Sequence, residues 1–185
     1  MNMKVYIGDV KKEVGLTSQE SLSKTFPPLS FGGEKIPFAQ PVQVDLTVTN
    51  CGSELWLEGK IKTAFILPCS RCLEPFIYQV EAPLKLEYRN LDRITRASDI
   101  EAEAKSADDM YYYHEEDAVI DIQRGVVEAL LIHFPMKPVC SEECQGLCPI
   151  CGANLNQGQC GCKRSTIDPR LAILGKIDLE KKLKK

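Results

Sequence analysis

The chain has 185 residues, of which 44% are hydrophobic and 26% are charged, and its formal net charge is −3. This length and composition fit one ordinary domain with a small appendage and exclude a chain that is disordered throughout. The negative net charge excludes a protein that coats nucleic acid by bulk electrostatics, so any RNA contact must be local. The sequence has neither a secretory leader nor a long apolar run, which predicts a cytoplasmic protein with no membrane partner.

Alternating apolar residues predict a β-hairpin in the first half of the chain. Residues 42–49 alternate apolar and polar side chains, as in a strand with one buried face. A turn follows at 50–53, and the alternation resumes over 54–67. Shorter runs at 3–7 and 20–26 are candidate strands whose pairing partners the sequence leaves open.

A second turn carries two cysteines. Residues 68–75 read Pro-Cys-Ser-Arg-Cys-Leu-Glu-Pro, and the alternation restarts after them, from Phe76 to Tyr88. The turn is therefore expected at the tip of a long hairpin, with Cys69 and Cys72 at its end.

An acidic stretch and one helix follow. Residues 99–121 contain nine acidic side chains and one lysine, which predicts a solvated loop at about 92–117. The tyrosine run at 111–113 is expected to pack on the sheet, because its acidic neighbours would repel the phosphates of a stacked RNA. Apolar residues at helical spacing over 122–134 predict a helix that covers one face of the sheet.

Together these elements predict an α+β fold. The main unit, residues 1–138, is expected to be an antiparallel sheet, arranged as a hairpin or meander and covered by one helix, with a barrel-like closure left open. Residues 139–185 are expected to form a small cysteine-rich, zinc-binding appendage. It would end in a basic helix that starts at Asp168-Pro169, a favourable pair for helix entry.

The cysteine spacing predicts a zinc site in this appendage. Six of the nine cysteines lie between residues 140 and 162, and a reducing compartment favours metal binding over disulfides. Cys148 and Cys151 are separated by two residues, and Cys160 and Cys162 by one. The polar loop between the pairs can fold back, so all four thiolates can meet one tetrahedral ion.

Two further cysteine pairs allow a second zinc ion. Cys69 and Cys72 lie at the predicted hairpin tip, whereas Cys140 and Cys144 precede the first set. Joining these four would clamp the sheet to the appendage, although the spacing also allows the tip cysteines to pair with Cys148 and Cys151. Cys51 is left over and is expected to be a structural thiol.

No pattern in the chain predicts an enzyme. Cys144, Cys148 and Cys151 match the three-cysteine spacing of radical iron–sulfur enzymes, but the 34 residues that follow are too few for the barrel those enzymes need. The two histidines lie outside any metal-binding spacing, which argues against a hydrolytic zinc site. We therefore expect neither catalytic residues nor a small-molecule substrate.

With these motifs the chain resembles the YceD family of bacterial and plastid proteins, in its zinc-knuckle form. The resemblance is carried by four blocks, residues 67–76, 121–138, 144–156 and 168–172. It implies a non-enzymatic factor that supports synthesis, processing or stability of large-subunit (23S) ribosomal RNA. It also marks Cys69, Arg71 and Cys72 as a functional surface and the 148–162 set as structural zinc.

The expected partner is therefore large-subunit ribosomal RNA, its precursor, or a ribosomal protein. Residues 163–185 contain eight basic and three acidic side chains, a local surplus that can hold phosphate despite the negative net charge. With Arg71, the candidate binding residues are Lys163, Arg164, Arg170, Lys176, Lys181 and Lys182. The alternative is a zinc-stabilised interaction module that holds a basic ribosomal protein through the acidic loop, with only an indirect effect on RNA.

Overall fold

The computed structural model of the chain describes residues 3–93 and 111–162. Within these residues the centre is a five-stranded sheet in the order β2-β5-β6-β7-β8. All neighbouring strands pair antiparallel except β7 and β8, which are parallel. The strands are β2 (Thr17–Lys24), β5 (Val42–Asn50), β6 (Glu54–Pro68), β7 (Pro75–Asn90) and β8 (Tyr111–Tyr113).

Shorter elements complete the described part of the fold. Strand β1 pairs with β9, and β3 pairs with β4, both antiparallel. Their bounds are β1 Lys4–Tyr6, β3 Leu29–Phe31, β4 Glu34–Ile36 and β9 Val119–Asp121, with 3-10 turns at Val10–Lys12 and Leu91–Arg93.

The hairpin predicted from alternation is confirmed. The even-numbered apolar residues of β5 are buried, and their neighbours Gln43 and Asp45 are exposed. The register places Val44 opposite Ile61 on β6, so buried positions of the two strands meet on one face of the sheet. This face forms the core of the molecule.

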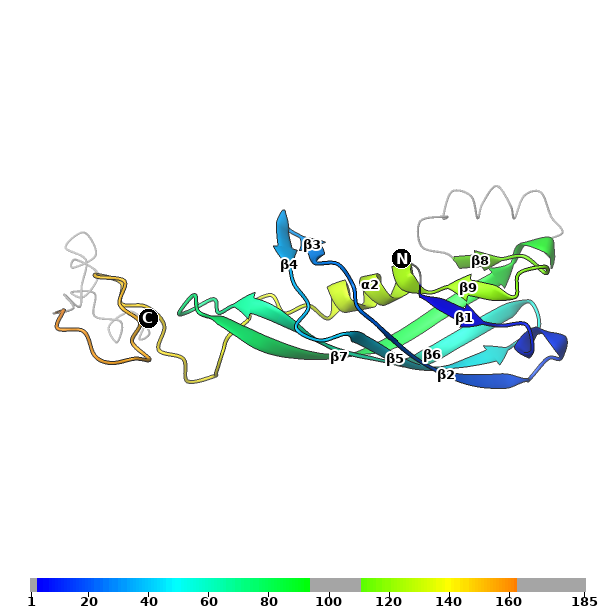
Figure 1. The fold of residues 1–185 in the computed structure, drawn as a ribbon, viewed down its shortest axis with the longest axis horizontal. Helices are drawn as coiled ribbons and strands as arrows, with labels where there is room; N and C mark the ends of the chain where they lie inside the picture. The colour runs from blue at the N-terminus through cyan, green and yellow to red at the C-terminus, as the bar shows by residue number, and fades with distance from the viewer. Residues whose placement is uncertain (1–2, 94–110, 163–185) are drawn as a thin grey trace, which may run out of the picture.

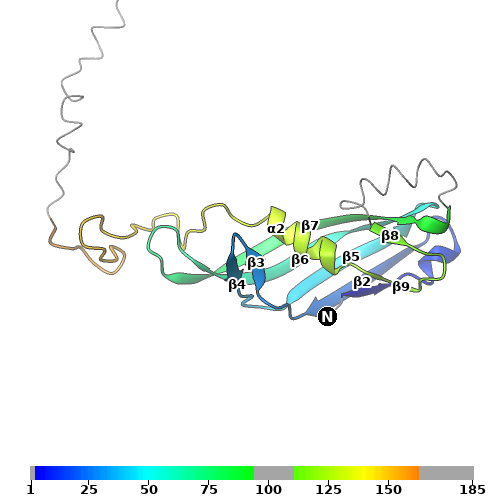
Figure 2. The ribbon, with the colours of Figure 1, turned by 90° about the horizontal axis from the view of Figure 1, so that it is seen from above.

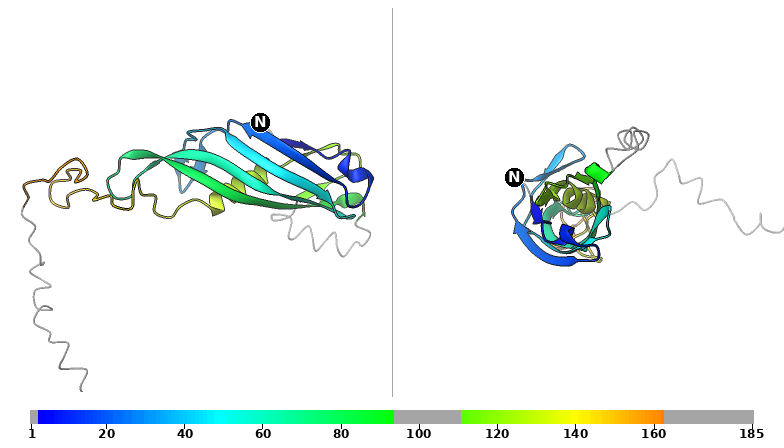
Figure 3. Two further views of the ribbon diagram at one scale, coloured as in Figure 1. Left: turned by 90° about the horizontal axis from the view of Figure 1, so that it is seen from below. Right: turned by 90° about the vertical axis from the view of Figure 1, so that its right-hand side faces the viewer.

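One helix, α2 (Gln123–Ile132), covers the sheet as expected. Val126 and Leu130 of this helix are fully buried against the core. Seen along its long axis, the sheet curls around α2 (Figure 3). Because β2 and β8 remain as its two edges, the sheet is not closed, and the α+β prediction is confirmed.

The tyrosine run packs on the sheet, as its acidic surroundings predicted. Residues 111–113 form β8, the ring of Tyr111 stacks on Tyr88 with centroids 5.1 Å apart, and Tyr113 is buried. Most of the predicted acidic loop, residues 94–110, lies outside the described residues. So does the predicted basic helix, within residues 163–185.

The molecule is elongated, and eight of its nine cysteines gather at one end. Beyond Lys62, where the pairing with β5 ends, β6 and β7 continue as a long hairpin. We call residues 63–80 the arm. Figures 1 and 2 show the cysteine-rich segment, residues 139–162, at the tip of the arm, whereas β1, β8 and β9 lie at the opposite end. In the described part of the chain, no helix has the length and apolar character needed to cross a membrane.

Candidate metal centres

Eight cysteines come together in two groups of four at the end of the arm. We call Cys69, Cys72, Cys140 and Cys144 cluster 1, and Cys148, Cys151, Cys160 and Cys162 cluster 2. The sulfur atoms of each cluster lie within 4.8 Å of one another. Cluster 2 is the set expected from spacing alone, and cluster 1 is one of the two pairings that the spacing allowed.

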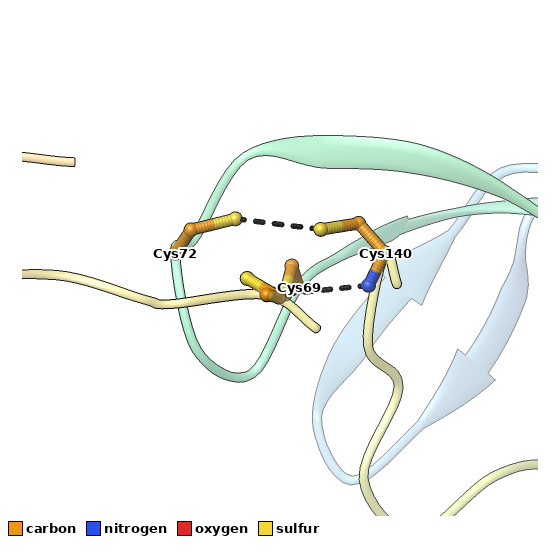
Figure 4. Close-up of side chains that lie close together, drawn as sticks. Cys69, Cys72 and Cys140 are labelled. Atoms are coloured by element: carbon orange, nitrogen blue, oxygen red, sulfur yellow. Dashed lines mark hydrogen bonds between the residues drawn. The ribbon is translucent and has the colours of Figure 1, made fainter. Parts of the chain in front are cut away.

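The sulfur geometry of cluster 1 suits a tetrahedral ion. Four thiolates at the usual zinc–sulfur distance of about 2.3 Å lie about 3.8 Å from one another. The sulfurs of Cys69 and Cys144 are 3.8 Å apart, and so are those of Cys72 and Cys140 (Figure 4). Each cluster could therefore hold one metal ion with four sulfur ligands.

The hairpin tip forms a tight turn around Cys69. The backbone N–H of Arg71 donates to Cys69 Sγ over 3.4 Å, and the N–H of Leu73 donates to the Cys69 carbonyl over 2.9 Å. Leu73 has a φ of 63°, in the left-handed region, which costs a leucine about 1–2 kcal/mol. A further N–H, from Cys140, donates to Cys69 Sγ over 3.4 Å (Figure 4).

Cluster 2 repeats this turn within the cysteine-rich segment. The N–H of Ile150 donates to Cys148 Sγ over 3.4 Å, and the N–H of Gly152 donates to the Cys148 carbonyl over 2.9 Å. Gly152 holds the left-handed position that Leu73 holds in the first turn, with a φ of 74°. The two turns are thus built alike, but only the second uses the residue that tolerates this backbone conformation.

Hydrogen bonds to sulfur lower the pKa of one thiol in each turn. The backbone N–H of Cys72, with those of Cys140 and Arg71, lowers the pKa of Cys69 to about 6. Backbone N–H groups of Cys151 and Ile150 likewise lower the pKa of Cys148 to about 6. Donors to sulfur stabilise the thiolate, the form that binds metal.

Neighbouring groups also shift the pKa of other thiols in the two clusters. The side-chain amide of Asn156 donates to Cys144 Sγ over 3.3 Å and lowers the pKa of this thiol. Shared protons and neighbouring charge raise the pKa of Cys140 to about 12, chiefly through Cys144, and that of Cys162 to about 12, chiefly through Cys151. Thiolates held this close together need a cation, so metal binding would release the remaining protons.

Arg71 joins the arm to the cysteine-rich segment. Its Nη1 donates to the carbonyls of Glu142 and Cys144 over 2.8 and 3.0 Å, and its own carbonyl accepts the N–H of Leu147 over 3.1 Å. Gly146 comes so close that a Cβ there would lie 2.9 Å from the Arg71 carbonyl oxygen. The sequence suggested Arg71 as a partner-binding residue, but its local structural role carried no sequence signal.

The clusters differ in how well they are covered. In cluster 1, three of the four cysteines are buried, and Phe76 and Val139 pack against them. In cluster 2 only Cys148 is buried. The arm thus covers cluster 1, and cluster 2 lies nearer the solvent.

The remaining candidates are placed as follows. Cys51 is exposed in the turn after β5 and belongs to neither cluster. His133 is exposed at the end of α2, where its Nδ1 lies 2.9 Å from the Ala129 carbonyl oxygen. The candidate binding residues Lys163, Arg164, Arg170, Lys176, Lys181 and Lys182 lie outside the described residues.

Comparison with known proteins places this architecture in a family. Residues 57–178 match the family model described as "Large ribosomal RNA subunit accumulation protein YceD", which confirms the resemblance found in the sequence. The matched range includes both clusters. No solved structure shows a significant match.

Individual relatives come from bacteria and chloroplasts. An uncharacterised protein of Mycobacterium tuberculosis is 29% identical over 72% of this chain and 60% of its own length. The chloroplastic large ribosomal RNA subunit accumulation protein YCED homolog 1 of Zea mays is 31% identical over 66% of this chain and 49% of its own length. YlbN, an uncharacterised protein of Bacillus subtilis, is 30% identical over 74% of both chains. The alignments thus span about three-fifths of the mycobacterial relative and half of the chloroplast one.

Proposed function

The chain belongs to the YceD family of large ribosomal RNA subunit accumulation proteins, and from this membership we propose that it is a non-enzymatic ribosome-biogenesis factor. Its role is to support the synthesis, processing or stability of large-subunit (23S) ribosomal RNA. The observation that carries this proposal is the family match over residues 57–178, together with two relatives named for ribosomal RNA accumulation.

Each cluster holds one Zn²⁺ as a structural ion. The support is chemical: four thiolates fill the coordination shell of zinc and leave no open position for a substrate or an activated water. Bound zinc would cross-link the turn at the arm tip to residues 139–147 and close the loop from 148 to 162.

The RNA contact is made by the basic C-terminal residues together with Arg71 of the arm tip. Local clustering supports this assignment, because residues 163–185 carry eight of the chain's 23 basic side chains. The Nη1 of Arg71 already serves two carbonyls, but a guanidinium has five N–H donors and can also reach a phosphate.

RNA capture from growing cells tests this proposal. The full chain is tagged, crosslinked to bound RNA, and recovered so that RNA and proteins are identified in one eluate. We expect discrete positions of large-subunit precursor RNA. Changing Lys176, Lys181 and Lys182 to Gln should lower RNA recovery and reduce the salt dependence of binding by about one unit of slope for each lost phosphate contact.

A control uses two lysines of the central sheet. Lys60 and Lys85 are exposed on the sheet, where they pair with Glu81 and Glu58. Changing both to Gln removes positive charge without touching the C-terminal segment, and RNA recovery should stay unchanged. Equal losses in both sets would contradict an RNA contact located at the C-terminus.

A second candidate function is the interaction module that holds a basic ribosomal protein. The acidic stretch favours it, because residues 99–121 carry nine acidic side chains and one lysine and so attract a basic protein. The same eluate would then contain a free ribosomal protein without RNA. Neutralising Glu101, Glu103, Asp108 and Asp109 of the acidic loop would weaken that complex and leave RNA recovery unchanged.

A further inference from the structure

One face of the arm exposes apolar side chains in register. Ile66 of β6 lies opposite Ile77 of β7, and Pro68 lies opposite Pro75. These residues occupy alternate positions of their strands, so they share one face. Ile66 is 40% exposed and Ile77 is 61% exposed. The other face of the arm is covered, because Phe76 packs against cluster 1.

We call this exposed face of β6 and β7 the outer face. Away from the arm, most of its side chains are charged. Nearer the centre of the sheet, most of the same alternate positions carry oppositely charged side chains that pair across the strands, with Trp56 exposed among them. These pairs are Lys60 with Glu81, Lys85 with Glu58, and Arg89 with Glu54. The outer face therefore changes from paired charges to exposed apolar residues where it reaches the arm. Contiguous exposed apolar residues next to a polar surface mark an interaction site.

The backbone conformation and exposure of Leu73, at the arm tip, also indicate an interaction site. Among the described residues it is the one non-glycine with a positive φ, and its side chain is 64% exposed. The matching position of cluster 2 is Gly152. A leucine here strains the backbone, and its exposed side chain gains little packing within the chain. Strain that folding does not require is a sign of a functional contact.

The charge around the arm tip selects the partner. Residues 66–77 and 136–162 contain three glutamates and two basic residues. A zinc ion with four thiolates adds a net charge of about −2 at each cluster. Apart from Arg71 and Lys137, the charges of this surface are negative and attract a cationic partner.

We propose that the outer face of the arm, with Ile66, Ile77 and Leu73 as apolar anchors, docks a segment of a partner protein that carries both basic and apolar side chains. The three anchors are not among the residues assigned to the RNA contact, which are Arg71 and the C-terminal basic residues, so the chain can hold RNA and protein at once. RNA itself does not fit this face of the arm, because the face presents aliphatic side chains and proline rather than aromatic rings for base stacking.

Site-specific photocrosslinking in growing cells tests this docking surface. The full chain carries p-benzoylphenylalanine at position 77, and in a control at position 119, where Val119 of β9 is 43% exposed at the opposite end of the molecule. Crosslinked segments are mapped by mass spectrometry. We expect partner protein segments of net positive charge with apolar residues, crosslinked at position 77 and absent at position 119.

A second variant separates docking from folding. Leu73→Gly gives the tip the residue that the matching turn of cluster 2 already has, so it should keep both metal ions and melt no lower than the parent. It should lower the crosslinking yield at position 77 about five- to tenfold, as expected for loss of an interface anchor. RNA recovery through the C-terminal residues should not change, which separates this test from that of the proposed function.

Several results would overturn the proposal. Nucleotide adducts at position 77 would make this face of the arm an RNA surface, and crosslinks to residues 163–185 of the same chain would show that the chain covers its own arm. The absence of any crosslink specific to position 77, acidic partner segments, or a yield unaffected by Leu73→Gly would also contradict it.

Discussion

Cluster 1 and cluster 2 each bring four cysteines together but connect very different parts of the chain. Cluster 1 joins cysteines up to 75 residues apart, from the hairpin tip and from the segment after α2. Cluster 2 draws all four ligands from residues 148–162. Closing the longer loop costs about 1.5 kcal/mol more chain entropy, by the logarithmic dependence on loop length.

This difference assigns the two clusters different tasks. Cluster 1 is the joint that holds the cysteine-rich segment on the arm, and it is reinforced by Arg71, Gly146 and the packing of Phe76. Cluster 2 folds its own short loop and has no such reinforcement from the arm among the described contacts. Metal loss should therefore detach a segment in the first case and loosen one loop in the second.

The largest expected effect comes from Cys144→Ser, which removes a ligand of cluster 1. Structural zinc contributes about 10 kcal/mol or more to the folding of its site, so the joint should open completely. Hydrogen exchange should accelerate strongly in residues 69–74 and 139–147, whereas β5 and α2 should stay protected. Unchanged protection at the arm tip would show that cluster 1 is not the joint.

Cys160→Ser makes the complementary test in cluster 2. Residues 148–162 should become accessible to limited proteolysis, while cleavage at the arm tip stays as slow as in the parent chain. Cys51→Ser is the matched control, because Cys51 belongs to neither cluster, and its cleavage pattern should not change. Detachment of the whole cysteine-rich segment in Cys160→Ser would erase the distinction between the clusters.

Gly146→Ala and Gly152→Ala compare the same added methyl group in the two clusters. Both glycines have a left-handed φ, 73° and 74°, so both substitutions should cost about 1 kcal/mol. Only at Gly146 does the added Cβ meet the Arg71 backbone, which should cost about 1–3 kcal/mol more. Competition with a chelator measures the metal affinity of each cluster. Gly146→Ala should lower the affinity of cluster 1 more than Gly152→Ala lowers that of cluster 2. Equal losses would mean that the contact with Arg71 is relaxed at no cost.

Arg71→Ala should have a smaller effect on the same joint. It removes the two hydrogen bonds from Nη1 to the carbonyls of Glu142 and Cys144, together worth about 1–2 kcal/mol. Thermal release of the segment, followed by hydrogen exchange of residues 140–147, should occur at a lower temperature. Arg71→Lys keeps the charge but not the forked donor and should rescue the joint only in part. Full rescue by lysine would show that charge, not donor geometry, holds the joint.

The smallest expected effect has the opposite sign. Leu73→Gly removes the left-handed strain of a leucine and should stabilise the arm tip by up to about 1 kcal/mol. Zinc affinity of cluster 1, measured by chelator competition, should be equal to or higher than that of the parent. A clear loss of affinity would show that the Leu73 side chain stabilises the turn.

Part of this architecture could be predicted from the sequence. Long strands with strict alternation, such as β5 and β6, and the turn with Cys69 and Cys72 were predicted at nearly their observed places. The β1–β9 pair and parallel β8 could not be placed, because a three-residue strand contains too few residues for a periodic signal.

The candidate metal centres could also be predicted only in part from the sequence. Local spacing suggested the grouping of cluster 2, whose ligands are close in sequence, whereas the ligands of cluster 1 meet only through the fold of the long hairpin. Spacing alone left two pairings open for the tip cysteines. Nor could spacing reveal that Arg71 binds backbone carbonyls, since a carbonyl acceptor leaves no trace in the sequence.

Metal stoichiometry of single intact molecules tests the two-cluster account most directly. Native mass spectrometry of the full chain, expressed with zinc, should show two zinc ions in the parent and one in each of Cys144→Ser and Cys160→Ser. The double variant should hold none. A parent with a single zinc ion, or one substitution that removes both ions, would contradict two separate four-thiolate sites.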